Sequence, residues 1–171
     1  MDTYRKVMQA EKFIAGFPKT RPALQKEQAE IFEREIIANR AGANLMSNLA
    51  QRLESWMHVT VAKQTEGKRL LEIGAGNLNH LQYLDWSKLE YVDAIEPMVA
   101  LYQDSPDKKK IRNFYADISE CQPFYHTIYS IAVLEHITNL PTVIAKAALL
   151  LSDNGKFLSG IPCEGGLLWG M

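Results

Sequence analysis

The spacing of hydrophobic positions changes near residue 66. Before that point, apolar side chains recur every three or four residues, which is the spacing of one face of a helix. The clearest run comprises Leu45, Leu49, Leu53 and Trp56. A second helix is predicted to start near Pro22 and to end before Gly42, and a third covers residues 2–15. We therefore predict that residues 1–65 form a set of N-terminal helices.

From Arg69 onward, short runs rich in β-branched and aromatic residues alternate with segments of helical spacing. The predicted strands cover residues 69–73, 91–96, 111–115, 127–133 and 155–161. The predicted helices cover residues 78–84, 98–103 and 140–151, and Asp153-Asn154-Gly155 marks the turn into the last strand. Strands that alternate with helices predict an α/β fold with a doubly wound, mostly parallel, Rossmann-like sheet over residues 66–171.

Composition and charge narrow the function classes. The chain has 171 residues, of which 47% are hydrophobic, and its formal net charge is −1. These values suit a globular protein and give no sign of a nucleic-acid or membrane surface. Lys108-Lys109-Lys110 is interpreted as a solvated loop before a strand. Cys121 and Cys163 form neither a metal-ligand cluster nor a disulfide framework, so we expect no metal and a cytoplasmic location. The sequence indicates no signal peptide and no membrane span.

The most informative segment is RLLEIGAGNLNHL, which covers residues 69–81. Its apolar start has the pattern of a buried strand and leads directly into Gly74-Ala75-Gly76, a tight turn where the backbone can approach a nucleotide-like ligand. Glu72 lies two residues before the first glycine. A carboxylate at that point would repel a pyrophosphate and attract a positive charge, and in an apolar strand end it needs a partner.

Three further features fall at the carboxyl ends of predicted strands, the edge where an open α/β sheet binds its ligand. Glu96, just before Pro97, is placed to accept hydrogen bonds from both hydroxyls of a ribose. Asp117-Ile118 offers an acceptor for the amine of adenine beside an apolar side chain, but Asp117 is equally interpreted as a cap or turn residue. His136, in Val133-Leu134-Glu135-His136, is either a structural histidine near a helix start or a base that contacts substrate.

Together these segments resemble the class I S-adenosylmethionine-dependent methyltransferases, most closely the small-molecule branch called type 11 or type 12. The resemblance covers residues 66–163. Its segments are 70–76, Ile95-Glu96-Pro97-Met98, Ala116-Asp117-Ile118, Val133-Leu134-Glu135-His136 and 149–157. It implies S-adenosylmethionine as the cofactor, S-adenosylhomocysteine as its product, and an unidentified small-molecule methyl acceptor.

The resemblance also implies which residues hold the cofactor. They are Glu72, Gly74, Ala75, Gly76, Glu96, Pro97, Met98, Asp117, Ile118, Ala132 and Val133. Glu72 and the glycine turn would hold the methionine part and its ammonium, and Glu96 would bind the ribose. Met98, Asp117 and Ile118 would contact the adenine. Ala132, Val133 and Leu134 would line the floor near the sulfonium.

Two features depart from the family pattern. Leu78 stands where a third glycine is common, so the turn is expected to be less open. The family sheet normally has seven strands, whereas this chain stops at residues 165–171, just after the fifth predicted strand. We therefore expect a truncated chain whose fifth strand is an exposed edge, available to pair with a second copy in a homodimer.

Catalysis and the N-terminal helices leave alternatives open. His136 is the first candidate for a catalytic base, and Glu135 is the second. Tyr4, Trp56 and His58 either cap the cofactor or belong to a helical layer that covers the sheet. Besides a methyltransferase, the sequence is compatible with a non-catalytic binding or scaffold protein of the same fold. A NAD-dependent oxidoreductase fits less well, because Asn79 stands where its fingerprint requires a glycine.

Overall fold

The computed structural model describes residues 3–16, 22, 25–31, 34, 45–122 and 124–162. The α-helices are α1 (Thr3–Gly16), α3 (Leu45–Gln64) and α4 (Leu140–Leu150). The strands are β1 (Arg69–Ile73), β2 (Tyr91–Ile95), β3 (Phe114–Tyr115), β4 (Tyr125–Ile131) and β5 (Leu151–Gly160). The 3₁₀-helices are η1 (Asn79–Tyr83), η2 (Trp86–Lys88), η3 (Val99–Leu101), η4 (Pro106–Lys110), η5 (Ile118–Glu120) and η6 (Leu134–His136).

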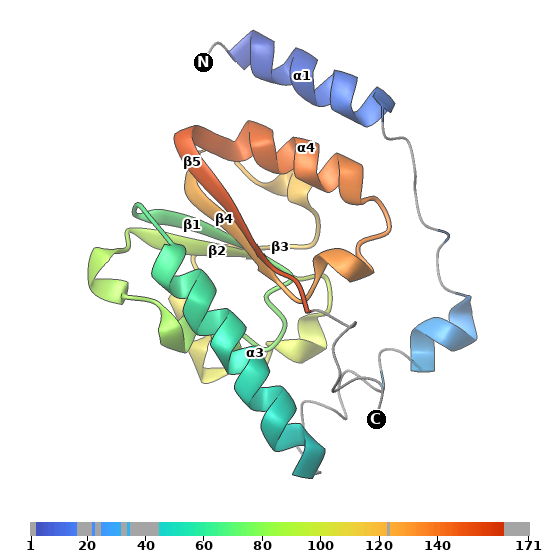
Figure 1. The fold of residues 1–171 in the computed structure, drawn as a ribbon, viewed down its shortest axis with the longest axis vertical. Helices are drawn as coiled ribbons and strands as arrows, with labels where there is room; N and C mark the ends of the chain where they lie inside the picture. The colour runs from blue at the N-terminus through green and yellow to red at the C-terminus, as the bar shows by residue number, and fades with distance from the viewer. Residues whose placement is uncertain are drawn as a thin grey trace.

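The five strands form one sheet in the order β3-β2-β1-β4-β5, and every neighbouring pair is parallel (Figure 1). The chain builds one half of the sheet from β1 outward to β3, and then crosses over to add β4 and β5 on the other side of β1. The predicted doubly wound α/β fold is confirmed. The direction of winding reverses between β1 and β4, and such a switch point opens a crevice at the carboxyl ends of the strands.

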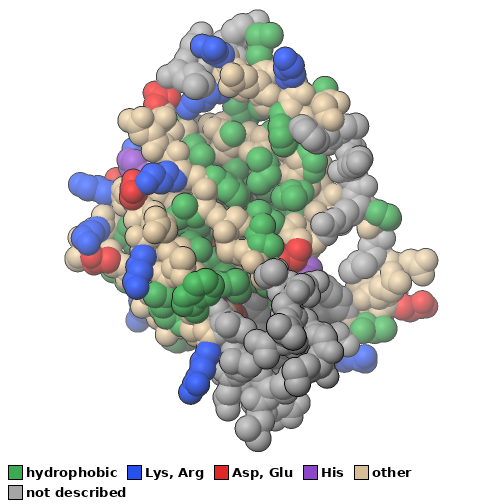
Figure 2. Space-filling model, in the orientation of Figure 1, with side chains coloured by type: hydrophobic (Ala, Val, Ile, Leu, Met, Phe, Trp, Pro, Cys, Tyr) green, Lys and Arg blue, Asp and Glu red, His purple; other side chains and the backbone are tan. Residues whose placement is uncertain are grey.

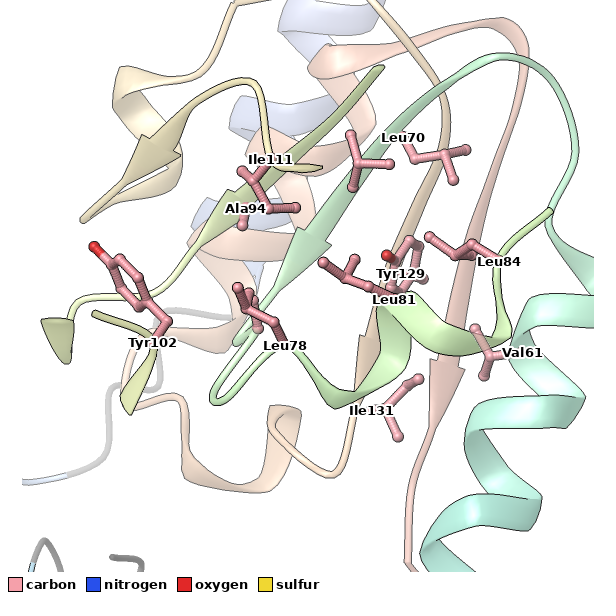
Figure 3. Close-up of a cluster of buried hydrophobic side chains, with 12 residues drawn as sticks. Val61, Leu70, Leu78, Leu81, Leu84, Ala94, Tyr102, Ile111, Tyr129 and Ile131 are labelled. Carbon is pink, nitrogen blue, oxygen red and sulfur yellow. The ribbon is translucent and has the colours of Figure 1, made fainter. Parts of the chain in front are cut away.

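Alternating side chains of the strands face two apolar layers. On one face, Leu70 and Tyr129 pack with Leu81 of η1 and Val61 of α3 (Figure 3). On the other face, Leu71 and Ile128 belong to a second cluster that includes residues of α4. Both β1 and β4 are therefore buried on both sides, as expected for central strands of a parallel sheet.

Helix α1 lies outside α4, so it forms an outer layer on that face (Figure 1). Its Lys6 donates a hydrogen bond to the carbonyl of Leu151 at 3.3 Å and pairs with Asp153 at 3.0 Å. Both contacts are at the start of β5, which is the end of the strand opposite the carboxyl edge. Helix α3 packs on the sheet, whereas α1 packs mainly on α4 and reaches β5 through Lys6.

Two of the predicted helical segments are shorter than expected and are 3₁₀-helices rather than α-helices. Residues 78–84 contain η1, and residues 98–103 contain only η3. Leu78 has a left-handed backbone, with φ of 67°, which prevents a regular α-helix from starting there. After η3, Ser105 is extended because it precedes Pro106, so the segment cannot continue as a helix.

Strand bounds differ from the prediction where side chains or backbone angles interrupt the ladder. The predicted strand 111–115 shrinks to Phe114–Tyr115, because the Asn113 N–H donates to the Asp93 carboxylate instead. Strand β4 ends at Ile131 rather than at residue 133, because Ala132 has a φ of 54°. The predicted strand 69–73 is confirmed.

The last strand starts four residues earlier than predicted. Leu151 pairs with Tyr125 and Lys156 pairs with Thr127, so residues 152–155 lie opposite a single residue of β4. The predicted Asp153-Asn154-Gly155 turn is therefore an irregularity within β5 rather than a connection before it. The predicted helix 140–151 is confirmed to within one residue at its end.

Among the described strands, β5 lies at the edge of the sheet, as predicted. In the orientation of Figure 1, Figure 2 shows hydrophobic side chains in the middle of the molecule and many of the charged side chains toward its left side. The homodimer stays a prediction.

The described helices include none with the length and apolarity that a membrane crossing requires. Lys108, Lys109 and Lys110 are exposed, although they belong to η4 rather than to a loop.

Candidate functional site

A cavity of about 780 Å³ lies at the carboxyl ends of β1, β2 and β4, at the switch point of the sheet. Its volume falls within the range of small-molecule sites. The predicted residues that line it are Gly74, Gly76, Glu96, Pro97, Met98, Asp117, Ile118, Ala132, Val133 and His136. The fold thus brings together side chains that the sequence places at four separate strand ends. Four predicted site residues, Glu72, Ala75, Leu134 and Glu135, do not line the cavity.

The glycine turn after β1 closely approaches Val133, which lies in the segment after β4. The Gly74 N–H donates to the carbonyl of Ile95 at 2.8 Å, which holds the turn against the end of β2. Gly74 has a φ of +73°, and a Cβ atom there would lie 2.4 Å from a methyl group of Val133. A side chain at this position is therefore excluded twice, by the backbone angle and by the space.

Leu78 has a left-handed backbone, a conformation that glycine adopts more easily than other residues. Its φ of 67° is left-handed, while its side chain is 1% exposed and belongs to the core cluster of Figure 3. Such a conformation costs a non-glycine residue about 1 kcal/mol or more, which core packing of the leucine offsets. The expectation that the turn is less open than the family pattern stays a prediction.

Glu96 connects two turns of the site. Its side chain is 7% exposed, and its carboxylate accepts the N–H of Gly76 at 2.8 Å and the N–H of Met98 at 2.9 Å. Hydrogen bonds between backbone N–H groups and a carboxylate are among the stronger ones in proteins. Glu96 therefore fixes the glycine turn relative to the segment after β2, and it lines the cavity from that position.

Asp117 fits both of its interpretations. It caps η5, since its carboxylate accepts the N–H of Ser119 at 2.8 Å and also the Ser119 hydroxyl. The hydroxyl, and then the N–H, lower the pKa of Asp117, so it is ionised at neutral pH. The same residue lines the cavity next to Ile118, whose side chain is buried.

Glu72 has a partner inside the protein. Its side chain is 3% exposed, and its carboxylate accepts the hydroxyl of Tyr129 at 3.3 Å. Burial, and then the charge of Glu72, raises the pKa of Tyr129 well above its usual value. Tyr129 is thus the partner that the buried carboxylate of Glu72 was expected to need. A direct contact between Glu72 and a ligand ammonium stays a prediction, and it is not favoured, because Glu72 does not line the cavity.

Helix α3 contributes a cavity residue that the sequence reasoning missed, Glu54. Asn79 Nδ2 donates to Glu54 Oε1 at 3.0 Å, and His58 Nε2 lies 3.6 Å from the same oxygen. His58 Nδ1 in turn lies 3.1 Å from His80 Nδ1. We call Glu54, Asn79, His58 and His80 the α3 wall. The sequence signal that could have indicated Glu54 is its spacing from His58, because residues four positions apart lie on the same face of a helix.

The predicted cap residues lie elsewhere. Trp56 is 66% exposed and does not line the cavity, while His58 is buried and stacks on Tyr83 with ring centroids 5.7 Å apart. His58 therefore belongs to a helical layer on the sheet, and α3 reaches the cavity through Glu54 instead. The side chain of Tyr4 and the whole of Cys163 lie outside the described residues. His136 is exposed and lines the cavity at the end of η6.

The cavity is acidic. Glu54, Glu96 and Asp117 line it, and no Lys or Arg does so among the described residues. A pyrophosphate would lack positive side chains here, whereas a cationic ligand would be attracted. The site therefore fits a nucleoside that carries a positive charge better than a dinucleotide. The described residues also contain no group of three or more His, Cys, Asp or Glu side chains arranged to hold a metal ion.

A parallel sheet with a glycine turn after β1 and an acid at the end of β2 defines a Rossmann-like nucleoside-binding domain. The chain belongs to the methyltransferase domain family, whose sequence pattern it matches over residues 45–166. This match confirms the resemblance to methyltransferases, whereas the narrower branch, type 11 or type 12, stays a prediction. The matched region starts before the predicted boundary at residue 66, so it includes α3. No curated protein sequence matches the chain significantly.

Solved structures share the fold at low sequence identity. The plantazolicin methyltransferase BpumL, solved in complex with S-adenosylhomocysteine, is 15% identical with a TM-score of 0.54, over 90% of this chain and 57% of that one. An S-adenosylmethionine-dependent methyltransferase from Clostridium acetobutylicum is 18% identical with a TM-score of 0.52, over 78% of this chain and 55% of that one. The chain thus spans little more than half the length of these relatives.

Proposed function

We propose that this chain binds S-adenosylmethionine and takes part in transfer of its methyl group to a small-molecule acceptor. The observation that carries the proposal is Glu96, a buried carboxylate that lines the cavity while it holds the glycine turn through Gly76. Membership of the methyltransferase domain family supports the same conclusion. An acidic cavity without described basic side chains fits a sulfonium and disfavours NAD.

Each part of the cofactor has a set of residues that would hold it. Glu96 would accept the ribose hydroxyls, since a carboxylate offers about four acceptor sites and two are used by backbone N–H groups. Met98 and Ile118 would pack on the adenine, and Asp117 would accept its amine. The open backbone at Gly74 and Gly76 would lie along the methionine part.

Methyl transfer requires the protein mainly to position the methyl donor and the acceptor. When bound, the sulfonium supplies an electrophilic methyl group, and the protein must align an acceptor with it and exclude water. Ala132 and Val133 would form the floor near the sulfonium, and His136 is the lining residue that can take a proton from the acceptor. Glu135, the other predicted base, does not line the cavity.

Calorimetric titration tests the proposal. The chain is titrated with S-adenosylmethionine, with S-adenosylhomocysteine and with NAD, and the titrations are repeated with Glu96→Ala. The proposal predicts binding of the first two ligands, no binding of NAD, and loss of binding in the variant. A folded protein that binds neither adenosyl ligand would contradict the proposal and favour a scaffold role for the fold.

A further inference from the structure

A second cavity lies at the edge of the sheet opposite the cofactor cavity. Its volume is about 520 Å³, and its lining includes Glu66 and Gly67, which lead into β1, and Leu89, which leads into β2. It is therefore located at the amino ends of these two strands, where α3 ends (Figure 1). Among the described residues, none lines both cavities, so the proposed function leaves the second cavity unexplained.

The second cavity offers apolar contacts to a ligand. Its apolar lining residues are Val59, Ala62, Leu84 and Leu89. Tyr83 lines it as well, and the ring of Tyr83 stacks on His58 with the ring centroids 5.7 Å apart. The volume is within the range of small-molecule sites, and apolar surface buried there would contribute to binding.

The charged side chains of the lining leave one positive charge without a partner. Lys88 Nζ pairs with Asp85 at 2.7 Å. Glu66 pairs with Lys156, which is not part of the lining. Lys63 forms no ion pair or hydrogen bond with another residue that the structure describes. A ligand with one negative charge would therefore neutralise the lining, whereas a second negative charge would meet carboxylates that are already paired.

The end of α3 is compatible with an anion beside it. Carbonyl groups at a helix C-terminus carry partial negative charge, which repels anions when the groups are unpaired. Here the carbonyl of Ala62 accepts the N–H of Thr65 at 3.2 Å, and the carbonyl of Val61 accepts the hydroxyl of Thr65 at 3.0 Å. Two of these carbonyls are thus engaged within the protein, and Lys63 of the last turn adds a cation.

We propose that the second cavity binds a small monocarboxylate with a hydrophobic body. The carboxylate would pair with the ammonium of Lys63 in a charge-assisted hydrogen bond, and the body would pack on the apolar lining. A phosphate dianion fits less well, because Asp85 and Glu66 line the same cavity. The inference goes beyond the proposed function, since it assigns a second ligand at the opposite edge of the sheet.

NMR titration of the isotope-labelled chain tests the inference, because the amide signals identify the cavity in which a probe binds. The probes are phenylacetate and its neutral analogue phenylacetamide. Each is titrated into the wild-type chain, into Lys63→Gln and into the control Lys109→Gln. Lys109 is exposed and lines neither cavity. Thermal unfolding of each variant checks that the fold is intact.

We expect phenylacetate to shift the amide signals of Thr65 and Gly67 until they saturate, and to leave those of Gly74 and Gly76 unchanged. Phenylacetamide should bind about fivefold more weakly, because it lacks the charge that pairs with a partly exposed lysine.

For the same reason, Lys63→Gln should weaken phenylacetate by about fivefold, while Lys109→Gln changes nothing. Three results would overturn the inference: shifts at the glycine turn alone, no saturation at about 10 mM probe, or equal affinity for the acid and the amide. A chain that binds phenylacetate in this way but does not bind S-adenosylhomocysteine would contradict only the proposed function.

Discussion

The cavity has two walls that are built in different ways. The first, which we call the nucleoside wall, consists of the glycine turn with Glu96, Met98, Asp117 and Ile118. Each of these residues lies within a few positions of a strand end. The α3 wall depends on contacts between residues of α3 and η1 that are 22 and 25 positions apart in the chain. Local motifs define the first wall, and tertiary packing defines the second.

The largest loss of stability is expected when the buried carboxylate of Asp93 is removed from β2, the strand that leads to Glu96 of the nucleoside wall. Asp93 is fully buried in β2, and its carboxylate accepts from Arg112 Nη2 at 2.6 Å and from the Tyr125 hydroxyl at 2.7 Å. Asp93→Ala leaves the hydroxyl of Tyr125 and the guanidinium without this partner. We expect a loss of about 3–5 kcal/mol in the free energy of unfolding, measured by urea denaturation.

The control is an exposed ion pair. Lys156 pairs with Glu66 at the surface, so Lys156→Ala should change the free energy of unfolding by less than about 1 kcal/mol. Similar losses for the two variants would mean that the buried Asp93 network contributes no more to stability than an exposed ion pair does.

The next effect concerns the glycine turn. Gly74→Ala would place a Cβ atom 2.4 Å from Val133 at a positive φ, so the turn must move away from the segment that follows β4. We expect at least a tenfold loss in affinity for S-adenosylhomocysteine and a destabilisation of about 1–3 kcal/mol. Gly160→Ala is the matched control, because its Cβ would meet its nearest atom at 3.5 Å. Unchanged affinity in Gly74→Ala would show that the turn does not contact the ligand.

Glu96 and Asp117 should differ in the strength of their effect on binding. Glu96 is buried and holds two N–H groups, whereas Asp117 is 60% exposed at its side chain. We expect Glu96→Gln to weaken S-adenosylhomocysteine by about 10- to 100-fold, and Asp117→Asn by about threefold. Equal effects in calorimetry would contradict the central position given to Glu96.

His80 of the α3 wall should affect how the free energy of unfolding depends on pH. His80 titrates near pH 6.5 in the unfolded chain and near pH 3 in the folded one, so the unfolded state binds more protons between these values. Its contribution is complete above pH 6.5 and is lost as the pH falls toward 3, by at most about 1.4 kcal/mol per pH unit. Urea denaturation at several pH values should therefore show a smaller acid slope in His80→Gln.

His80 contacts His58, Tyr83 and Tyr129, and Glu54 lies beyond His58. An acid slope that is identical in wild type and in His80→Gln would show that His80 is not the group that titrates.

The smallest effect is expected at Ala132. This residue has a φ of 54° and lines the cavity. Ala132→Gly relieves the backbone strain but increases the entropy of the unfolded chain, and these terms are similar in size. We expect the free energy of unfolding to change by less than about 1 kcal/mol. A larger loss in thermal or urea unfolding would mean that the methyl group of Ala132 makes an important packing contact.

The comparison of the walls also explains what the sequence could predict. The strand and turn around Gly74 follow from a short apolar run and its glycines, and the acid at Glu96 follows from its place at a strand end. Parallel strands bring their carboxyl ends to one edge, so these local features predict a shared site without further information. The described structure places Gly74, Gly76, Glu96, Asp117 and Ile118 in one cavity accordingly.

Features that depend on packing could not be predicted in the same way. Glu54 lies on a helix whose apolar spacing indicates only which face is buried, and its contact with Asn79 requires the position of α3 on the sheet. The type and length of the two helical segments that are 3₁₀-helices could not be predicted, because apolar spacing does not distinguish a left-handed residue such as Leu78 from a helical one. The ligand of Glu72 was inferred from its charge, whereas the fold supplies Tyr129 as its partner.

A crystal structure of this chain with S-adenosylhomocysteine tests the central claim most directly. The account predicts that the ribose hydroxyls contact Glu96 while Gly76 keeps its hydrogen bond to the same carboxylate, with the adenine between Met98 and Ile118. A complex in which the ligand lies outside this cavity, or in which Glu96 does not touch it, would contradict the proposed cofactor site.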